Sequence, residues 1–261
     1  MRCPDPRAPL RAGTVREYDL PVISVCMATF NGARYVRRQV ETIVAQLRPE
    51  DELVVSDDSS SDDTVAIVRS LGDPRIRILE GNTFRSPLLN FELAIKKARG
   101  DTIVLSDQDD VWLENKLPLV RQLFAREATR PYLVVLDARI VDESEQVIHP
   151  SVQAKLNAGP GLLKNLWTNR YLGCCMAFSH DLLDVALPFP AGVGMHDIWL
   201  GQLCERVGTT AFVPVTTMLY RRHEANTTGF DIRLEPVKQI RRRLVLAWSL
   251  ARRGTLGQRP S

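Results

Sequence analysis

Apolar residues in the first hundred positions form short runs separated by amphipathic stretches. Four runs rich in β-branched residues predict buried strands, at Val22–Ala28, Leu53–Val55, Ile76–Leu79 and Ile103–Leu105. Between these runs, apolar residues recur at helical spacing, in the sets Val36, Val40, Ile43 and Leu47; Val65, Val68 and Leu71; and Leu88, Phe91, Ile95 and Ala98. This alternation predicts an α/β fold with a mostly parallel, doubly wound sheet.

The second half has a less regular pattern. We expect strands at Leu133–Leu136 and Cys174–Phe178 and a helix at Ile198–Val207, followed by short edge strands at Ala211–Val215 and Met218–Tyr220. Pro160–Asn169 fits a linker or a short helix. A last helix is expected within Leu234–Ala251, with one apolar face formed by Val237, Ile240, Leu244, Trp248 and Ala251.

Composition narrows the class of protein. The chain has 261 residues, of which 44% are hydrophobic and 25% charged, as in ordinary globular domains. No apolar run approaches the roughly 20 residues of a membrane-spanning helix, and the first residues lack the apolar core of a signal peptide. Five cysteines without metal-ligand spacing favour buried, reduced thiols in a cytoplasmic protein.

The net charge of +3 hides an asymmetry. From Arg221 onward there are ten basic and three acidic residues, whereas the rest of the chain has 24 basic and 28 acidic ones. Lys238 and Arg241–Arg243 surround the apolar face of the last helix. This helix is therefore expected either to lie on an anionic membrane or to pack on its own domain.

Three polar segments follow predicted strands, at Thr29–Gly32, Asp57–Asp63 and Ser106–Trp112. Ligands of open α/β sheets bind at the carboxyl ends of the parallel strands, where these segments should meet. So many carboxylates would repel one another, and the Asp-x-Asp of Asp107–Asp109 fits Mg²⁺ or Mn²⁺ shared with a diphosphate. For Asp57–Asp63 alone, a solvated loop that caps the next helix is an equal alternative.

Other nucleotide-binding classes lack support. The chain has neither the GxGxxG fingerprint of dinucleotide-binding domains nor the GxxxxGK[ST] of P-loop proteins. Both of those classes need these glycines to hold phosphates close to the backbone.

The motifs resemble a known family. Val22–Gln46, Val54–Thr64 and Asn90–Lys116 are similar to the inverting family 2 glycosyltransferases of the GT-A fold. The sequence SDQDDVW at Ser106–Trp112 resembles the rhamnosyltransferase-like subgroup of bacterial surface polysaccharide synthesis. The resemblance continues through Gly173–Phe178, His196–Trp199 and Tyr220–Gly229.

The resemblance implies donor-binding roles. Thr29, Asn31 and Asp58 would contact the nucleotide, with Asp58 accepting a hydrogen bond from a pyrimidine N–H. Asp107 would touch both the ribose and a metal ion. The donor would be a UDP-sugar or a dTDP-sugar.

It also implies metal-binding and catalytic roles. Asp109 would bind Mg²⁺ or Mn²⁺, and His223 would contact the metal or a phosphate. Asp197 would be the general base, with Trp199 expected to desolvate it and raise its pKa. The structural alternatives are a helix cap for Asp197 and a satisfied structural histidine for His223.

The implied function is inverting transfer of a sugar, in this subgroup rhamnose, to a hydroxyl of a lipid-linked glycan or polysaccharide. We expect a disordered leader over residues 1–18, a GT-A domain with a small acceptor-side extension over 19–230, and a basic tail over 231–261. The expected location is the cytoplasm, at the inner face of the cell membrane, with no nucleic-acid partner.

Two alternatives remain from different classes. A nucleotidyltransferase would attack phosphorus, but its early glycine-rich loop is absent between Val22 and Arg37. A non-catalytic sugar-binding scaffold would be expected to lose one acidic group, whereas Asp109 and Asp197 are both present.

Overall fold

The computed structural model describes residues 20–223 and 236–253. The expected leader over residues 1–18 lies outside these ranges. Within them, no helix has the length and apolar character needed to span a membrane.

The secondary structure alternates as expected in the first half. The strands are, in chain order, β1 (Ile23–Thr29), β2 (Glu52–Asp57), β3 (Ile76–Leu79), β4 (Thr102–Ser106), β5 (Val111–Trp112), β6 (Tyr132–Val141), β7 (Val147–His149), β8 (Met176–Ser179) and β9 (Thr209–Arg221). The α-helices are α1 (Val36–Val44), α2 (Thr64–Ser70), α3 (Pro87–Lys96), α4 (Lys116–Arg126), α5 (Val152–Leu156), α6 (Leu162–Trp167), α7 (Leu183–Ala186), α8 (His196–Val207) and α9 (Pro236–Arg253). Two short 3₁₀ helices, η2 (Gly173–Cys175) and η3 (His180–Leu182), flank β8.

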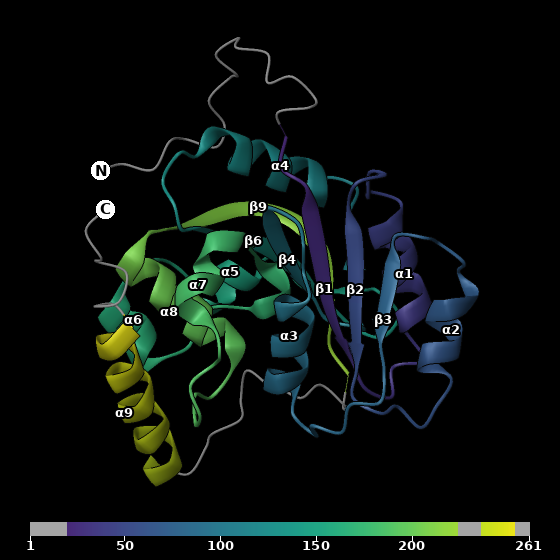
Figure 1. Ribbon diagram of the computed structural model, residues 1–261. Helices are drawn as coiled ribbons and strands as arrows, with labels where there is room; N and C mark the ends of the chain where they lie inside the picture. Colours follow the sequence, from purple (N-terminus) through teal and green to yellow (C-terminus); the bar gives the residue numbers. More distant parts are fainter. Residues whose placement is uncertain (1–19, 224–235, 254–261) are drawn as a thin grey trace.

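The strands form one curled sheet in the order β3-β2-β1-β4-β8-β6-β9-β5, and β7 pairs with β6 (Figure 1). The strands β3, β2, β1 and β4 are parallel. The chain runs outward from β1 to β3 and then returns to β4 on the other side of β1. This reversal creates a topological switch point between β1 and β4, where open α/β sheets bind ligands.

Helices cover both faces of the parallel half. Almost every residue of β1, β2 and β4 is buried, as a strand enclosed on both sides requires. The helix α3 packs on β1 and β2, while α1 and α2 contact each other on the opposite side (Figure 1). Right-handed crossovers require this arrangement, because the winding direction reverses after β3.

The second half of the sheet is mixed. The strand β8 enters antiparallel between β4 and β6, so the predicted parallel arrangement holds for the first half only. The two short edge strands expected near the end are a single interior strand, β9, paired with β6 and β5. The register shifts opposite Asp137, where β9 accommodates Pro214. A bulge tolerates proline, which has no N–H to donate.

The cysteines of the described part behave as expected from the sequence. Cys26, Cys174, Cys175 and Cys204 are all buried free thiols. Burial raises the pKa of the Cys204 thiol to about 12, so this side chain stays protonated and acts as a small apolar group.

Candidate active site

The three polar segments meet at one edge of the sheet. Thr29 is in register with Asp57 of β2, and Met27 is in register with Ser106 of β4. The segments that follow these strands therefore surround the switch point. The structure thus brings together the positions that the sequence placed at separate strand ends.

The first and third segments are joined by Gln108. Its Oε1 accepts a hydrogen bond from the backbone N of Phe30 at 2.9 Å, and its Nε2 donates to the Phe30 carbonyl at 3.0 Å. A Cβ atom added to Gly32 would lie 2.2 Å from Gln108 Oε1. Glycine at this position allows the amide to approach, so the β1–α1 turn and the acidic loop form one unit.

The carboxylates of Asp57–Asp63 are mostly used within the protein. Asp57 accepts hydrogen bonds from Thr29 Oγ1 at 2.8 Å and from the backbone N of Ser60 at 2.8 Å. Asp62 accepts from the backbone N of Ala33 at 3.0 Å. Burial opposes its ionisation, but bonds from Thr64 and Ala33 outweigh it and lower the pKa of Asp62. For these two carboxylates, the loop-stabilising interpretation is the one that fits.

Two of the residues expected to contact the nucleotide, Asp58 and Asn31, lie in the turns that follow β2 and β1 at the same edge. Asp58 accepts from the backbone N of Phe84 at 2.5 Å and from that of Ser86 at 3.0 Å, and so holds the β3–α3 loop. Asn31 adopts a left-handed backbone conformation, with φ of 48°, and its Oδ1 accepts from the backbone N of Ser61 at 2.8 Å.

The loop after β4 concentrates negative charge. Burial raises the pKa of Asp107 to about 7, and the nearby charges of Asp109 and Asp197 add to the effect. Burial also raises the pKa of Asp110, with further contributions from Asp109 and Asp107. The ligand atoms of Asp107, Asp110 and Cys174 lie within 4.8 Å of one another. The acidic loop and Asp197 thus belong to one electrostatic site.

This cluster fits a hard divalent cation. In the described part of the chain, the buried Oδ2 of Asp110 has no hydrogen-bond partner. Burial raises the pKa of the Cys174 thiol well above its usual value, so Cys174 is a poor ligand and the available donors are oxygens. Oxygen donors with excess negative charge suit Mg²⁺ or Mn²⁺. Asp110 was not among the ligands predicted from the sequence.

His223 lies beside the acidic loop. Its Nε2 is 2.8 Å from Asp109 Oδ2, and its ring stacks on Tyr35 with 5.0 Å between centroids. Tyr35 was not predicted from the sequence. It belongs to the turn that precedes α1, so the stack joins the first and last motifs of the chain.

Two basic residues that were not predicted from the sequence contact the same loop. Arg221 donates from its backbone N to Asp110 Oδ1 at 3.2 Å and from Nε to the Asp109 carbonyl at 3.1 Å. Lys116 is buried in α4, with Nζ 4.2 Å from the Trp112 ring centroid and 2.7 Å from the Cys174 carbonyl. Burial lowers its pKa. Lys116 follows the aspartates of Ser106–Trp112 closely in the sequence, which was the available signal, whereas Arg221 has no aspartate near it in the sequence.

Asp197 is a buried carboxylate in the first turn of α8. Only 8% of the residue is exposed, and burial raises its pKa to about 6. Its Oδ1 accepts from the backbone N of Ile198 at 2.6 Å, and its Oδ2 accepts from Asn169 Nδ2 at 3.1 Å. Asn169 precedes the GCC segment and was not predicted. The N-cap of α8 is Met195, so Asp197 does not hold the capping position.

Trp199, which was expected to desolvate Asp197, is fully buried in the same helix. Its indole Nε1 donates to the Ala186 carbonyl at the end of α7, at 3.0 Å. Helix residues two positions apart point in different directions, and this bond directs the indole N–H toward α7. The neighbouring His196 instead packs on Phe91, with ring centroids 4.1 Å apart.

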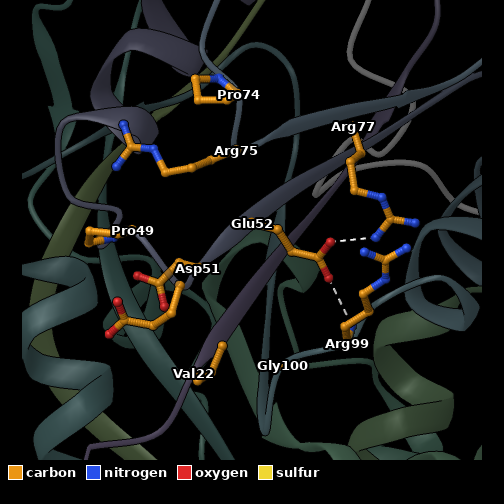
Figure 2. A pocket seen from close by; sticks show the side chains of 10 residues that line it. Val22, Pro49, Asp51, Glu52, Pro74, Arg75, Arg77, Arg99 and Gly100 are labelled. Carbon is orange, nitrogen blue, oxygen red and sulfur yellow. Dashed lines mark hydrogen bonds and ion pairs between the residues drawn. The ribbon is translucent and has the colours of Figure 1, made fainter. Parts of the chain in front are cut away.

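A cavity at the opposite end of the strands is a poor candidate for the site. It has a volume of about 310 Å³ and lies beside the amino ends of β1–β4 (Figure 2). Its charged side chains are largely paired: Arg77 with Glu52, and Asp51 with Arg121. Glu52 also accepts from the backbone N of Arg99 at 2.8 Å (Figure 2). These contacts pair the charges at the amino edge of the sheet. The excess negative charge lies at the carboxyl edge.

Comparisons with known proteins agree with this architecture. Residues 24–186 match the sequence profile of Glycosyl transferase family 2. The match covers more than half of the chain, which therefore belongs to this family.

Solved structures show the same GT-A fold. The S. aureus TarS fragment in complex with UDP-GlcNAc aligns with a TM-score of 0.66 at 19% identity, covering 87% of this chain and 66% of that one. The mannosyltransferase PcManGT from Pyrobaculum calidifontis, in complex with GDP-Man and Mn²⁺, aligns with a TM-score of 0.58 at 18% identity, covering 91% and 74%. The predicted fold class is confirmed.

Curated relatives match over shorter segments. One is the Escherichia coli UDP-Glc:alpha-D-GlcNAc-diphosphoundecaprenol beta-1,3-glucosyltransferase WfgD, at 31% identity over 38% of this chain and 39% of that protein. Another is the Campylobacter jejuni GalNAc(5)-diNAcBac-PP-undecaprenol beta-1,3-glucosyltransferase, at 33% identity over 40% and 34%. The matched segments span less than half of these relatives.

Proposed function

We propose that the protein is an inverting glycosyltransferase that moves a sugar from a nucleotide diphosphate donor to a hydroxyl of a lipid-linked glycan or polysaccharide. The observation that carries the proposal is Asp197, a buried carboxylate in the first turn of α8 that is close enough to Asp107 to contribute to the raised pKa of that group. Family membership and the GT-A fold support the reaction class.

Asp197 has the properties of a general base. With a pKa of about 6 it is ionised at neutral pH, yet it is more basic than an exposed aspartate. In the proposed step it takes the proton of the acceptor hydroxyl as that oxygen bonds to the anomeric carbon. The bond from this carbon to the diphosphate breaks on the opposite side, so the configuration inverts.

Asp107 and Asp109 would hold Mg²⁺ or Mn²⁺ together with the buried Asp110, and His223 would contact the metal or a phosphate. When bound, the cation supplies positive charge that stabilises the departing diphosphate. The mannosyltransferase neighbour was solved with Mn²⁺, which supports this choice of ions.

Donor binding is assigned to Thr29, Asn31, Asp58 and Asp107. Asp58 already accepts two backbone N–H groups, and a carboxylate has further lone pairs for a pyrimidine N–H. A relative named for UDP-Glc and a neighbour bound to UDP-GlcNAc support a uridine nucleotide. The SDQDDVW motif supports dTDP-rhamnose, so both donors belong in the test.

The acceptor is proposed by analogy with the named relatives. Two of them are glucosyltransferases whose names specify diphosphoundecaprenol or PP-undecaprenol substrates. We propose that this chain also works on such a lipid-linked acceptor, at the cytoplasmic face of the cell membrane.

The test is a transfer assay with a panel of nucleotide sugars, Mn²⁺ and a lipid-diphosphate saccharide acceptor. We expect release of nucleoside diphosphate and a product whose new linkage, read by NMR, is inverted relative to the donor. Retention would contradict the role of Asp197. Release of pyrophosphate would indicate a nucleotidyltransferase, and donor binding without any release would indicate a scaffold.

A further inference from the structure

One side of the helix α9 packs on the rest of the described structure. Leu246 and Leu250 are buried, and α9 packs against α8 and α6. Arg253 donates to the carbonyls of Val185 at 2.8 Å and Leu187 at 2.7 Å, which fixes the end of α9 to the end of α7. In Figure 1, α9 lies at the outer edge of the molecule.

The opposite side of α9 exposes large apolar side chains. Ile240, Leu244 and Trp248 are 55%, 66% and 60% exposed, and their spacing of four residues places them in one row. The neighbouring helix α6 continues this surface with Leu163 and Trp167, which are 83% and 70% exposed. We call these five residues the α6–α9 face.

Arginine connects and borders the two helices. The Arg243 guanidinium lies 4.6 Å from the Trp167 ring centroid and donates to the Trp167 carbonyl, which links α9 to α6. Arg241 and Arg252 are exposed, and Arg252 lies 4.6 Å from the Trp248 ring centroid. The sequences of α6 and α9 contain no Asp or Glu.

We propose that the α6–α9 face docks the enzyme on an anionic lipid bilayer. Clustered exposed apolar groups mark an interaction surface. Two helices with arginines, two exposed tryptophans and no carboxylates of their own match the boundary between lipid headgroups and acyl chains, where arginine stems lie among apolar groups and keep their charge at the phosphates.

The position of this face relative to the site suits an acceptor that arrives from a membrane. A Cβ on Gly192 would lie 3.6 Å from Val245, and one on Gly194 would lie 3.6 Å from Arg242. These glycines belong to the loop that leads directly into His196 and Asp197. Docking through α9 would therefore hold the loop before the proposed base close to the bilayer; this step alone rests on the proposed function.

The test is sedimentation of the intact chain with vesicles of phosphatidylcholine alone or mixed with phosphatidylglycerol. We expect strong binding to the mixed vesicles, weak binding to the neutral ones, and partial release by salt. The double substitution Leu244→Ser/Trp248→Ser should weaken binding at least about tenfold, because both side chains lose their burial in lipid. Arg241→Gln should weaken it about fivefold.

A matched control removes exposed apolar groups elsewhere. Val147 and Ile148 of β7 are 56% and 57% exposed, so Val147→Ser/Ile148→Ser also removes two exposed apolar side chains and should leave binding unchanged. All variants should keep the melting temperature and donor hydrolysis of the natural chain, because none of these residues lies in the proposed site.

The outcomes separate the two proposals. Vesicle binding without sugar transfer by the natural chain would refute the proposed function and keep the docking face. Donor hydrolysis without binding to mixed vesicles would refute the docking face. A dimer in solution that Leu244→Ser/Trp248→Ser dissociates would assign the face to a second copy and overturn the proposal.

Discussion

The ionised form of Asp197 lowers the stability of the folded protein. Its pKa rises from about 3.8 to about 6 on folding, so ionising it costs roughly 3 kcal/mol more in the folded than in the unfolded protein. This penalty is fully present above pH 6 and disappears below about pH 4. A carboxylate with only a structural role would not be expected at a position where its charge lowers the stability of the protein.

Replacing this carboxylate should therefore separate stability from activity. We expect Asp197→Asn to raise the free energy of unfolding at pH 8 by about 2 kcal/mol, allowing for one weakened hydrogen bond, and to give no gain at pH 4. Turnover should fall on the order of a hundredfold or more, with donor affinity nearly unchanged. Denaturant unfolding at both pH values and steady-state kinetics measure these effects. A variant that keeps its turnover would show that Asp197 is not the base.

Asn169 positions that base through the bond to Asp197 Oδ2 at 3.1 Å, which lowers the pKa of the carboxyl. Asn169→Ala should raise this pKa further, so the acidic limb of the profile of kcat/KM against pH should move to higher pH. Donor KM should stay constant. The exposed neighbour Thr168 offers the control Thr168→Ala, and an unchanged limb in Asn169→Ala would assign Asn169 to loop structure alone.

Among the connecting segments, the β1–α1 turn depends on a glycine. A Cβ at Gly32 would displace the Gln108 amide and break its two bonds to Phe30, each worth about 1 kcal/mol. Gly32→Ala should thus cost about 2 kcal/mol in the natural chain and close to nothing in a Gln108→Ala background. Urea unfolding of the four proteins tests this coupling. Equal losses in both backgrounds would place the cost in the backbone of the turn.

Local patterns were enough to predict the elements of the first half. The strands β1 to β4 and the helices α1 to α3 each have an apolar period that is complete within the segment. The helix α4 was not predicted, because Lys116 and Arg121 occupy buried positions and interrupt its apolar period. The strand β9 was divided at Thr216 and Thr217, because its continuity depends on pairing with β6, a segment far away in the sequence.

The distinction between local patterns and contacts across the sequence also applies to the site. Thr29, Asp58 and Asp107 were placed at one edge from strand ends alone, since parallel strands share their carboxyl edge. The contacts that orient them were not predictable, because they join residues distant in sequence. Gln108 bonds a residue 78 positions away, and Asn169 reaches Asp197 over 28 positions. Such pairings depend on the assembled fold.

At the scale of the whole molecule, charges are paired at one edge of the sheet and crowded at the other. The amino edge pairs Arg77 with Glu52 and Asp51 with Arg121, whereas the carboxyl edge raises the pKa of Asp107 and Asp110 by crowding them. Without a ligand, the crowding of carboxylates at the carboxyl edge does not stabilise the protein. We infer that the carboxyl edge is poised for a cation, and that removing one carboxylate should have opposite effects on the free and the loaded protein.

Asp109→Ala tests that inference, because Asp109 contributes to the raised pKa of both Asp107 and Asp110. Without ligands, the variant should melt at the same or a higher temperature, since one repelling charge is gone. With Mn²⁺ and UDP at about a hundredfold their dissociation constant, the natural chain should melt about 5 °C higher or more, and the variant should show no such shift. Asp63→Ala is the matched control, because this exposed aspartate at the same edge makes no capping bond and its variant should keep the full shift. If Asp109→Ala keeps the Mn²⁺-dependent shift, the cation is held by other residues and the assignment of Asp109 is wrong.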